Sequence, residues 1–149
     1  MADRLIRVGR VSKIDYDNGM VAVTYPDLDD SVTSFLSVVS FNDEYKMPGI
    51  GDEVLVVHLS SGQSRGLVLG HYWNKTNISE HTGEGIYRKE FGQDYGEAYM
   101  DYDGEELEIY APSIRLSTAA GSITVDEIIA LRDQISSLAG RVAAVEARV

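Results

Sequence analysis

The sequence predicts a mainly β protein in three parts, a small barrel over residues 1–77, a second β segment over 78–123 and a helix over 124–149. Two observations predict this division. Short runs of alternating or β-branched residues, separated by turn signals, fill the chain as far as Val125. The last stretch instead repeats apolar residues at intervals of three and four, which is the spacing of a helix with one apolar seam.

Five short strands are predicted in the barrel. The first alternates apolar and polar residues, with Ile6 and Val8 on its apolar face, and the slip at Gly9 predicts a bulge or a sharp bend. Asn18-Gly19 predicts a hairpin turn, because glycine readily adopts the positive φ that tight turns need. The strands are expected over residues 4–15, 20–25, 33–40, 53–59 and 65–72, with a turn over 60–64.

Two details refine the prediction for the barrel. Val21, Val23 and Tyr25 alternate with other residues and should share one face of the second strand. The unbroken run EVLVVHL in the fourth strand indicates burial on both faces. A bent first strand and a Gly-rich approach to the fourth are typical of a small Greek-key barrel of the OB type, although the spacing also allows an SH3-like barrel.

The middle segment is acidic and cannot build a core of its own. Residues 78–118 carry ten Asp and Glu against three Lys and Arg. Each of its strands offers one narrow apolar row, and so short a segment with few large apolar groups does not close a hydrophobic core. Burial of these rows therefore requires copies of the same chain. The strands are expected over residues 86–91, 97–102, 107–111, 114–118 and 123–125.

The C-terminal segment has the heptad spacing of a coiled coil. Thr124 and Glu127 predict a capping box at its start. Arg141 at position g and Glu146 at the following e suit an ion pair between parallel chains. A lone helix of this length that contains Gly140 is marginal in water, so we expect self-association, with packing against the barrel as the alternative. The spacing leaves two or three chains open. The a and d positions are Ile128, Leu131, Ile135, Leu138, Val142, Val145 and Val149.

The sequence contains no pattern typical of an active site. It has no cysteine, and His58, His71 and His81 lie far apart, with His58 and His71 expected to be structural strand residues. The acidic run DYDGEE lacks the spacing of a calcium loop. We therefore predict no enzymatic activity, no metal and no cofactor. The net charge of −11 argues against nucleic acid as a partner.

The N-terminus, MADRLIRVGRV, contains no apolar run of signal-peptide length, and no window of the sequence approaches a membrane span. We therefore expect a soluble protein made in a cytoplasm. The nine tyrosines could in principle stack on the bases of single-stranded nucleic acid. Tyr87, Tyr95, Tyr99 and Tyr102, however, lie in the acidic segment, which would repel phosphate, and are expected to be strand residues at a crowded surface between chains.

Four stretches of the first half, RVGRV, NGMVAV, PGIGDEVLV and GLVLG, resemble the OB domain of baseplate assembly protein V, the central spike of contractile phage tails. Related domains occur in phage-tail-like bacteriocins and in type VI secretion spike proteins. In that family the OB domain is followed by a trimeric β-prism or triple-stranded β-helix. The resemblance therefore implies a homotrimer with an OB-fold barrel, an intertwined β shaft and a parallel coiled coil.

The resemblance also implies a role and partners. The spike would plug the tail tube and hub, contact the baseplate hub and tail-tube initiator proteins, and meet the target membrane only during puncture. A separate tip protein is a further candidate partner. The protein would be made in the bacterial cytoplasm and assembled into the baseplate of a phage tail or phage-tail-like particle. The alternative is a trimeric receptor- or carbohydrate-binding tail appendage.

Two departures from the family concern the distal end of the spike. Many such spikes carry an HxH motif that holds iron, and this sequence has none. It also has no room for the lysozyme domain of larger relatives. The expected trimer interface combines the seven a and d positions with alternating residues of the shaft, which are Leu107, Ile109, Ile114, Leu116 and Ile123.

Overall fold

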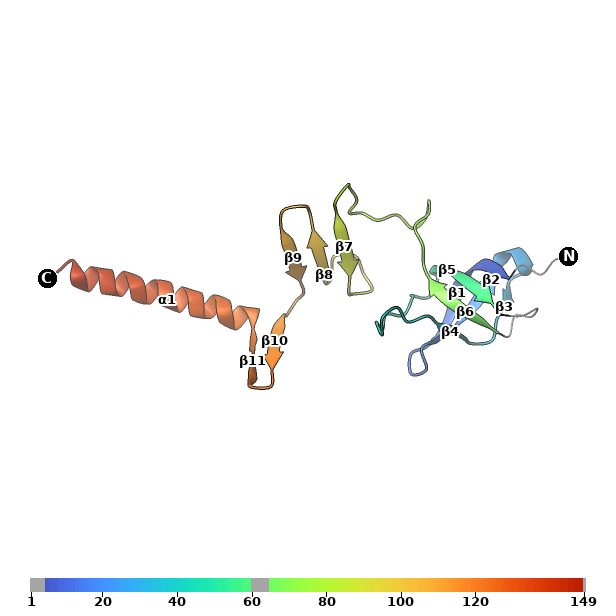
Figure 1. Cartoon of the computed structure of the whole chain (residues 1–149), viewed down its shortest axis with the longest axis horizontal. Helices are drawn as coiled ribbons and strands as arrows, with labels where there is room; N and C mark the ends of the chain where they lie inside the picture. The colour runs from blue at the N-terminus through green and yellow to red at the C-terminus, as the bar shows by residue number, and fades with distance from the viewer. Residues whose placement is uncertain (1–4, 60–64, 149) are drawn as a thin grey trace. The chain divides into compact units, whose positions relative to one another are not determined.

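The computed structural model describes residues 5–59 and 65–148 and is mainly β with one C-terminal helix (Figure 1). Its internal contacts divide the chain into two units, residues 1–82 and 83–149. The turn predicted over residues 60–64 lies outside the described residues, as does Arg4, the first residue of the first predicted strand.

The first unit is a five-stranded barrel. The sheet runs in the order β1-β5-β6-β4-β2 and closes through a pairing of β1 with β2. β4 and β6 pair in parallel, whereas the other pairings described for the barrel are antiparallel. The elements of this unit are β1 (Ile6–Asp15), β2 (Met20–Tyr25), the 3-10 helix η1 (Pro26–Leu28), β3 (Ser31–Val32), β4 (Leu36–Val38), β5 (Glu53–His58) and β6 (Gly66–Gly70).

The third predicted strand is shorter than expected. The sequence predicts one strand over residues 33–40, but the structure has only the three residues of β4 there. The two-residue β3 precedes it and pairs with β2 outside the closed ring of the barrel. Between β3 and β4, the Thr33 hydroxyl accepts a hydrogen bond from the Val23 backbone N–H, which ties the connection to β2.

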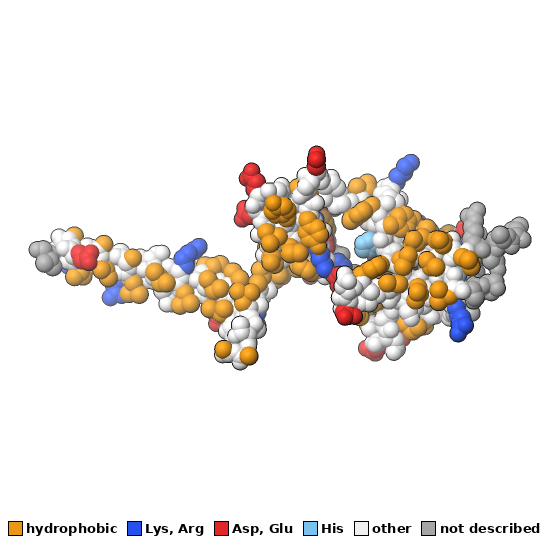
Figure 2. Space-filling view, viewed as in Figure 1, with side chains coloured by type: hydrophobic (Ala, Val, Ile, Leu, Met, Phe, Trp, Pro, Cys, Tyr) orange, Lys and Arg blue, Asp and Glu red, His pale blue; other side chains and the backbone are white. Residues whose placement is uncertain are grey.

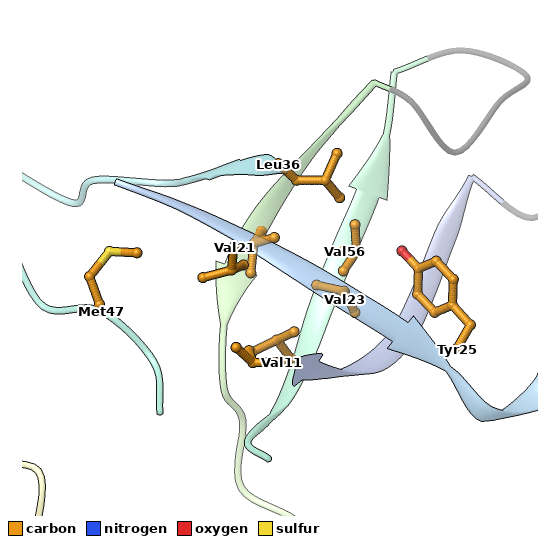
Figure 3. Packing of buried hydrophobic residues seen from close by; sticks show 9 residues of the cluster. Val11, Val21, Val23, Tyr25, Leu36, Met47 and Val56 are labelled. Atoms are coloured by element: carbon orange, nitrogen blue, oxygen red, sulfur yellow. The ribbon is translucent and has the colours of Figure 1, made fainter. Parts of the chain in front are cut away.

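The hydrophobic core lies inside the barrel. Side chains from β1, β2, β4 and β5 point toward one another there (Figure 3). The predicted apolar face of β2 is confirmed, because Val21, Val23 and Tyr25 are all fully buried. The Tyr25 hydroxyl and His58 Nε2 lie 2.8 Å apart in a buried hydrogen bond, which gives His58 the structural role expected of it. The core cluster consists of Val11, Val21, Val23, Tyr25, Leu36, Met47, Val54, Val56 and Val68.

The face predicted for the first part of β1 was wrong. Ile6 and Val8 are 60% and 41% exposed, while Gly9 and Val11 point inward. Gly9 pairs regularly with Val54 and forms no bulge. A Cβ at position 9 would overlap the Val23 side chain and lie 2.8 Å from the Thr24 carbonyl oxygen, so glycine is needed because β2 passes so close. The irregularity in the β1–β2 pairing falls later, between Val11 and Lys13.

Burial along β5 also differs from the prediction. Val54, Val56 and His58 are buried, whereas Glu53, Leu55 and Val57 are only partly buried. A strand of a closed barrel has one inner and one outer face, so its burial alternates even where its sequence does not. The apolar residues at alternate positions of β5 therefore lie on the outside of the barrel.

The second unit contains a three-stranded antiparallel sheet, a two-stranded hairpin and the helix. The predicted capping box is confirmed, because the Thr124 N–H donates to the Glu127 carboxylate at 2.7 Å and Thr124 Oγ1 accepts from the Glu127 N–H at 3.2 Å. The Thr124 N–H and the Thr124 hydroxyl, which donates at 2.8 Å, both bond the Glu127 carboxylate and hold its pKa below the usual value. The elements are β7 (Tyr87–Glu90), β8 (Tyr99–Tyr102), β9 (Leu107–Tyr110), β10 (Arg115–Thr118), β11 (Gly121–Thr124) and α1 (Val125–Glu146).

Candidate assembly surface

The second unit has no buried core within the chain. None of the described residues after Val68 is buried. This unit nevertheless contains regular strands and a 22-residue helix, which in proteins are stabilised mainly by packing of their apolar faces. The surfaces that could supply such packing are therefore the candidate functional site of this protein.

The sheet of β7, β8 and β9 has one apolar face. Its register places Tyr87, Tyr102 and Leu107 abreast in one row. Lys89, Met100 and Ile109 form a second row on the same face, because side chains alternate along each strand. Leu107 and Ile109 are 58% and 53% exposed, so nothing in the described chain covers this face.

The opposite face of the same sheet is polar, and several of its side chains interact with one another within the chain. The Arg88 guanidinium carbon lies 3.4 Å from the centre of the Tyr99 ring and 5.0 Å from that of Tyr95. Arg88 Nε donates to Glu90 at 2.7 Å. The Tyr99 hydroxyl donates to Glu108 at 3.0 Å, and this bond raises the pKa of Tyr99. The polar face therefore has its partners already, and the apolar face is the one that needs some.

The hairpin of β10 and β11 also has one apolar and one polar face. Leu116 and Ile123 are opposite each other in the register and share a face with Ile114. Leu116 is 57% exposed. On the other face the Arg115 guanidinium donates to the Ser122 hydroxyl at 3.1 Å. The hairpin thus also presents an apolar face without cover.

The seam residues of helix α1 that the structure describes are all exposed. No described residue of the helix is buried, and hydrophobic side chains are visible along it in Figure 2. Neither Arg141 nor Glu146 forms an ion pair within the described residues, so both are free to pair with another chain. Val149, the last predicted seam residue, lies outside the described residues. The exposed fractions are 42% for Ile128, 49% for Leu131, 65% for Ile135, 53% for Leu138, 55% for Val142 and 64% for Val145.

The sequence analysis missed Met100 and did not separate the two faces of the sheet. Tyr87, Met100 and Tyr102 lie on the apolar face beside Leu107 and Ile109, and Tyr99 lies on the polar face. The tyrosines, which the sequence analysis took as one group, therefore divide between the two faces. The signal that separates Tyr99 from Tyr102 is the turn at Asp103-Gly104, because it fixes the register between β8 and β9 and hence which residues of β8 share a face with Leu107 and Ile109.

Other kinds of site are not found in the described part of the chain. No three His, Asp or Glu side chains there come together in a group that could hold a metal ion. None of the helices in residues 5–59 and 65–148 combines the length and the apolar character needed to span a bilayer. No protein-family model matches the sequence, and no curated protein matches it.

Proposed function

We propose that this chain forms the homotrimeric central spike of a contractile injection machine, a structural protein without catalytic activity. The observation that carries the proposal is the absence of any buried residue in the described part of the second unit. A sheet, a hairpin and a helix that each expose one apolar face need a common partner. Further copies of the chain supply the same faces in the same order, which makes them the simplest partner.

The connectivity of the barrel supports the OB type over the SH3-like alternative. Around the ring the strands follow the order β1-β2-β4-β6-β5, and the β4–β6 pair is parallel. This is the Greek-key order of OB barrels, in which the third and fifth strands pair in parallel. The five strands of the ring are counted without β3, which lies outside it.

In the trimer, the apolar faces of the second unit line the interior of a β shaft and the seam of a parallel coiled coil. Three chains rather than two are supported by the resemblance to baseplate assembly protein V. The charged groups on the opposite faces then remain in water, where a net charge of −11 per chain keeps the particle soluble. Packing of the three chains against one another would also cover strand edges that could otherwise pair with unrelated chains.

The same resemblance supports the partners of the spike. Its barrels would contact the baseplate hub and the tail-tube initiator proteins, and its far end would meet the target envelope or a separate tip protein. Contraction of the sheath would supply the energy, and the spike would supply a stiff body that pierces the membrane. Assembly would follow synthesis in a bacterial cytoplasm.

The mass of the purified chain in solution, measured by light scattering, tests the proposal. Three chains of 16.4 kDa give a mass of about 49 kDa. A second version that ends at Thr124, the last residue of β11, shows which element holds the trimer together. Loss of the trimer would assign this role to the helix, and retention would assign it to the β shaft. A mass of one chain for both versions would refute the spike.

One observation favours a second candidate, a trimeric receptor- or carbohydrate-binding tail appendage. Tyr95 and Tyr110 are each 47% exposed on the polar side of the sheet, and the ring of Tyr110 stacks on that of Tyr99 with centres 5.2 Å apart. Exposed aromatic rings beside carboxylates are suited to stacking on sugars. Saturable binding to a glycan array that is lost in Tyr110→Ala would favour this candidate over a purely mechanical spike.

A further inference from the structure

The barrel carries an apolar patch on its outer surface. Ile6 and Val8 of β1 lie beside Val57 and Leu55 of β5 in the register. Leu67 of β6 lies beside Val57 and extends the same face. Figure 2 shows hydrophobic side chains spread over the barrel. The outer barrel patch is defined here as Ile6, Val8, Leu55, Val57, Leu67 and Leu69.

An apolar outer face is unusual for a small barrel of mainly antiparallel strands. The outer faces of such barrels are usually polar and solvated. Here the outer face is apolar across β1, β5 and β6, and the patch ends at Arg10 and Glu53 on one side and at Ser37, which lies beside Leu67 in the register, on another. Val8 and Leu69 are 41% and 37% exposed, and contiguous exposed apolar surface of this kind marks an interaction site.

The charges around the patch indicate the chemistry of its partner. A hollow of about 430 Å³ lies over β1 next to η1. Its charged lining residues are paired with each other, Arg7 with Asp27 at 3.2 Å and Arg10 with Glu53 at 3.5 Å. The patch thus offers apolar surface with a balanced border, which suits an uncharged protein surface and gives no anchor for a phosphate or a strongly charged protein.

A second copy of this chain meets that requirement. Copies that each carry a net charge of −11 repel one another over most of their surface, and the balanced patch is where that repulsion is weakest. Self-association of the second unit also holds the barrels near one another, so that the effective concentration of one barrel around the next reaches about the millimolar range. A modest apolar contact is enough at that concentration.

We propose that the outer barrel patch packs against the barrel of a neighbouring copy, so that the barrels form a second self-association element. This inference rests on the proposed trimer and extends it to a surface outside the shaft and the coiled coil. In a ring of three chains each contact is head-to-tail, so the patch meets a different surface of the next barrel. The barrels would then form a closed collar.

Cysteine labelling tests this inference, because the chain contains no cysteine and a single introduced thiol is unique. Val8→Cys places the thiol in the patch. Lys13→Cys is the matched control, since Lys13 is exposed toward the far end of the same strand, outside the patch. In the full-length assembled protein we expect maleimide to label Val8→Cys at least about tenfold more slowly than Lys13→Cys, because a covered thiol reacts only after the contact opens.

A variant of the chain that does not assemble shows whether the patch is covered by another copy or by the same chain. Ile109→Asp and Ile135→Asp together place charges on the sheet and the seam, and dilution brings this variant to the mass of one chain. There Val8→Cys should react as fast as Lys13→Cys. Protection that persists in the single chain would overturn the inference, because the cover would then come from the same chain.

The outcomes separate this inference from the proposed function. An assembled trimer in which Val8→Cys reacts as fast as Lys13→Cys would overturn the contact between barrels but not the trimer, and a different protein would then be the candidate partner of the patch. A wild-type chain with the mass of a single copy would overturn the proposed trimer itself, and the collar with it. Ile6→Cys, at a position that is 60% exposed in the chain, repeats the measurement at a second site.

Discussion

Replacing Gly140 by alanine tests whether the helix forms together with the assembly. Gly140 lies at heptad position f, away from the a and d seam, and a Cβ built there meets nothing within 4 Å. Alanine in a helix interior is favoured over glycine by about 1 kcal/mol. If three helices fold as they associate, Gly140→Ala adds about 3 kcal/mol per trimer, which is roughly a 150-fold larger association constant.

The assay is light-scattering mass over a dilution series, combined with thermal unfolding followed by circular dichroism at several protein concentrations. Ala144→Gly is the matched control, because Ala144 is also exposed in α1 and off the seam. It should weaken association about as much as Gly140→Ala strengthens it. A change of about 1 kcal/mol that does not depend on protein concentration would refute the coupling of helix formation to assembly.

Three further predictions concern the barrel and the seam. Burial raises the pKa of Tyr25 to about 12 from 10.0, so the folded barrel should keep its full stability below pH 10 and lose up to about 2–3 kcal/mol as the pH rises through 12. Urea midpoints between pH 8 and 12 should show this loss for the wild type and not for Tyr25→Phe, and equal slopes would contradict it. Gly9→Ala should destabilise the barrel by about 1–3 kcal/mol in urea, since its Cβ overlaps Val23, and an unchanged midpoint would show that β2 can move aside. Ile135→Asp should lower the assembled mass or the helix melting temperature, whereas Ser136→Asp, one residue off the seam, should leave both nearly unchanged; equal effects would mean that the seam is not an interface.

The elements that sequence reasoning predicted well are those fixed by local signals. The Asn18-Gly19 turn separates β1 from β2 as expected, and Thr124 caps the helix as its capping box predicts. The helix itself also follows from the spacing of its apolar residues, whereas its role as a coiled coil stays a prediction. Each of these features depends on residues within a few positions of one another.

The features that were missed depend on contacts between distant strands. Gly9 interrupts the alternation of β1, but only the close passage of β2 explains why a glycine is there. Ile6 and Val8 alternate like core residues, and closure of the barrel places them outside. In the same way, alternation identifies Leu107 and Ile109 as one row, whereas the pairing with β8 is needed to place Met100 beside them.

The junction between the hairpin and the helix has a geometric consequence. Thr124 is both the last residue of β11 and the N-cap of α1, and the Val125 N–H donates to the Ile114 carbonyl at 3.0 Å. No spacer separates strand from helix, so the angular phase of the heptads is set by the hairpin. One residue inserted after Thr124 would turn the helix by about 100° about its axis. The strands and the seam would then be out of phase, and a rod that requires both to face the same axis could not close along its full length.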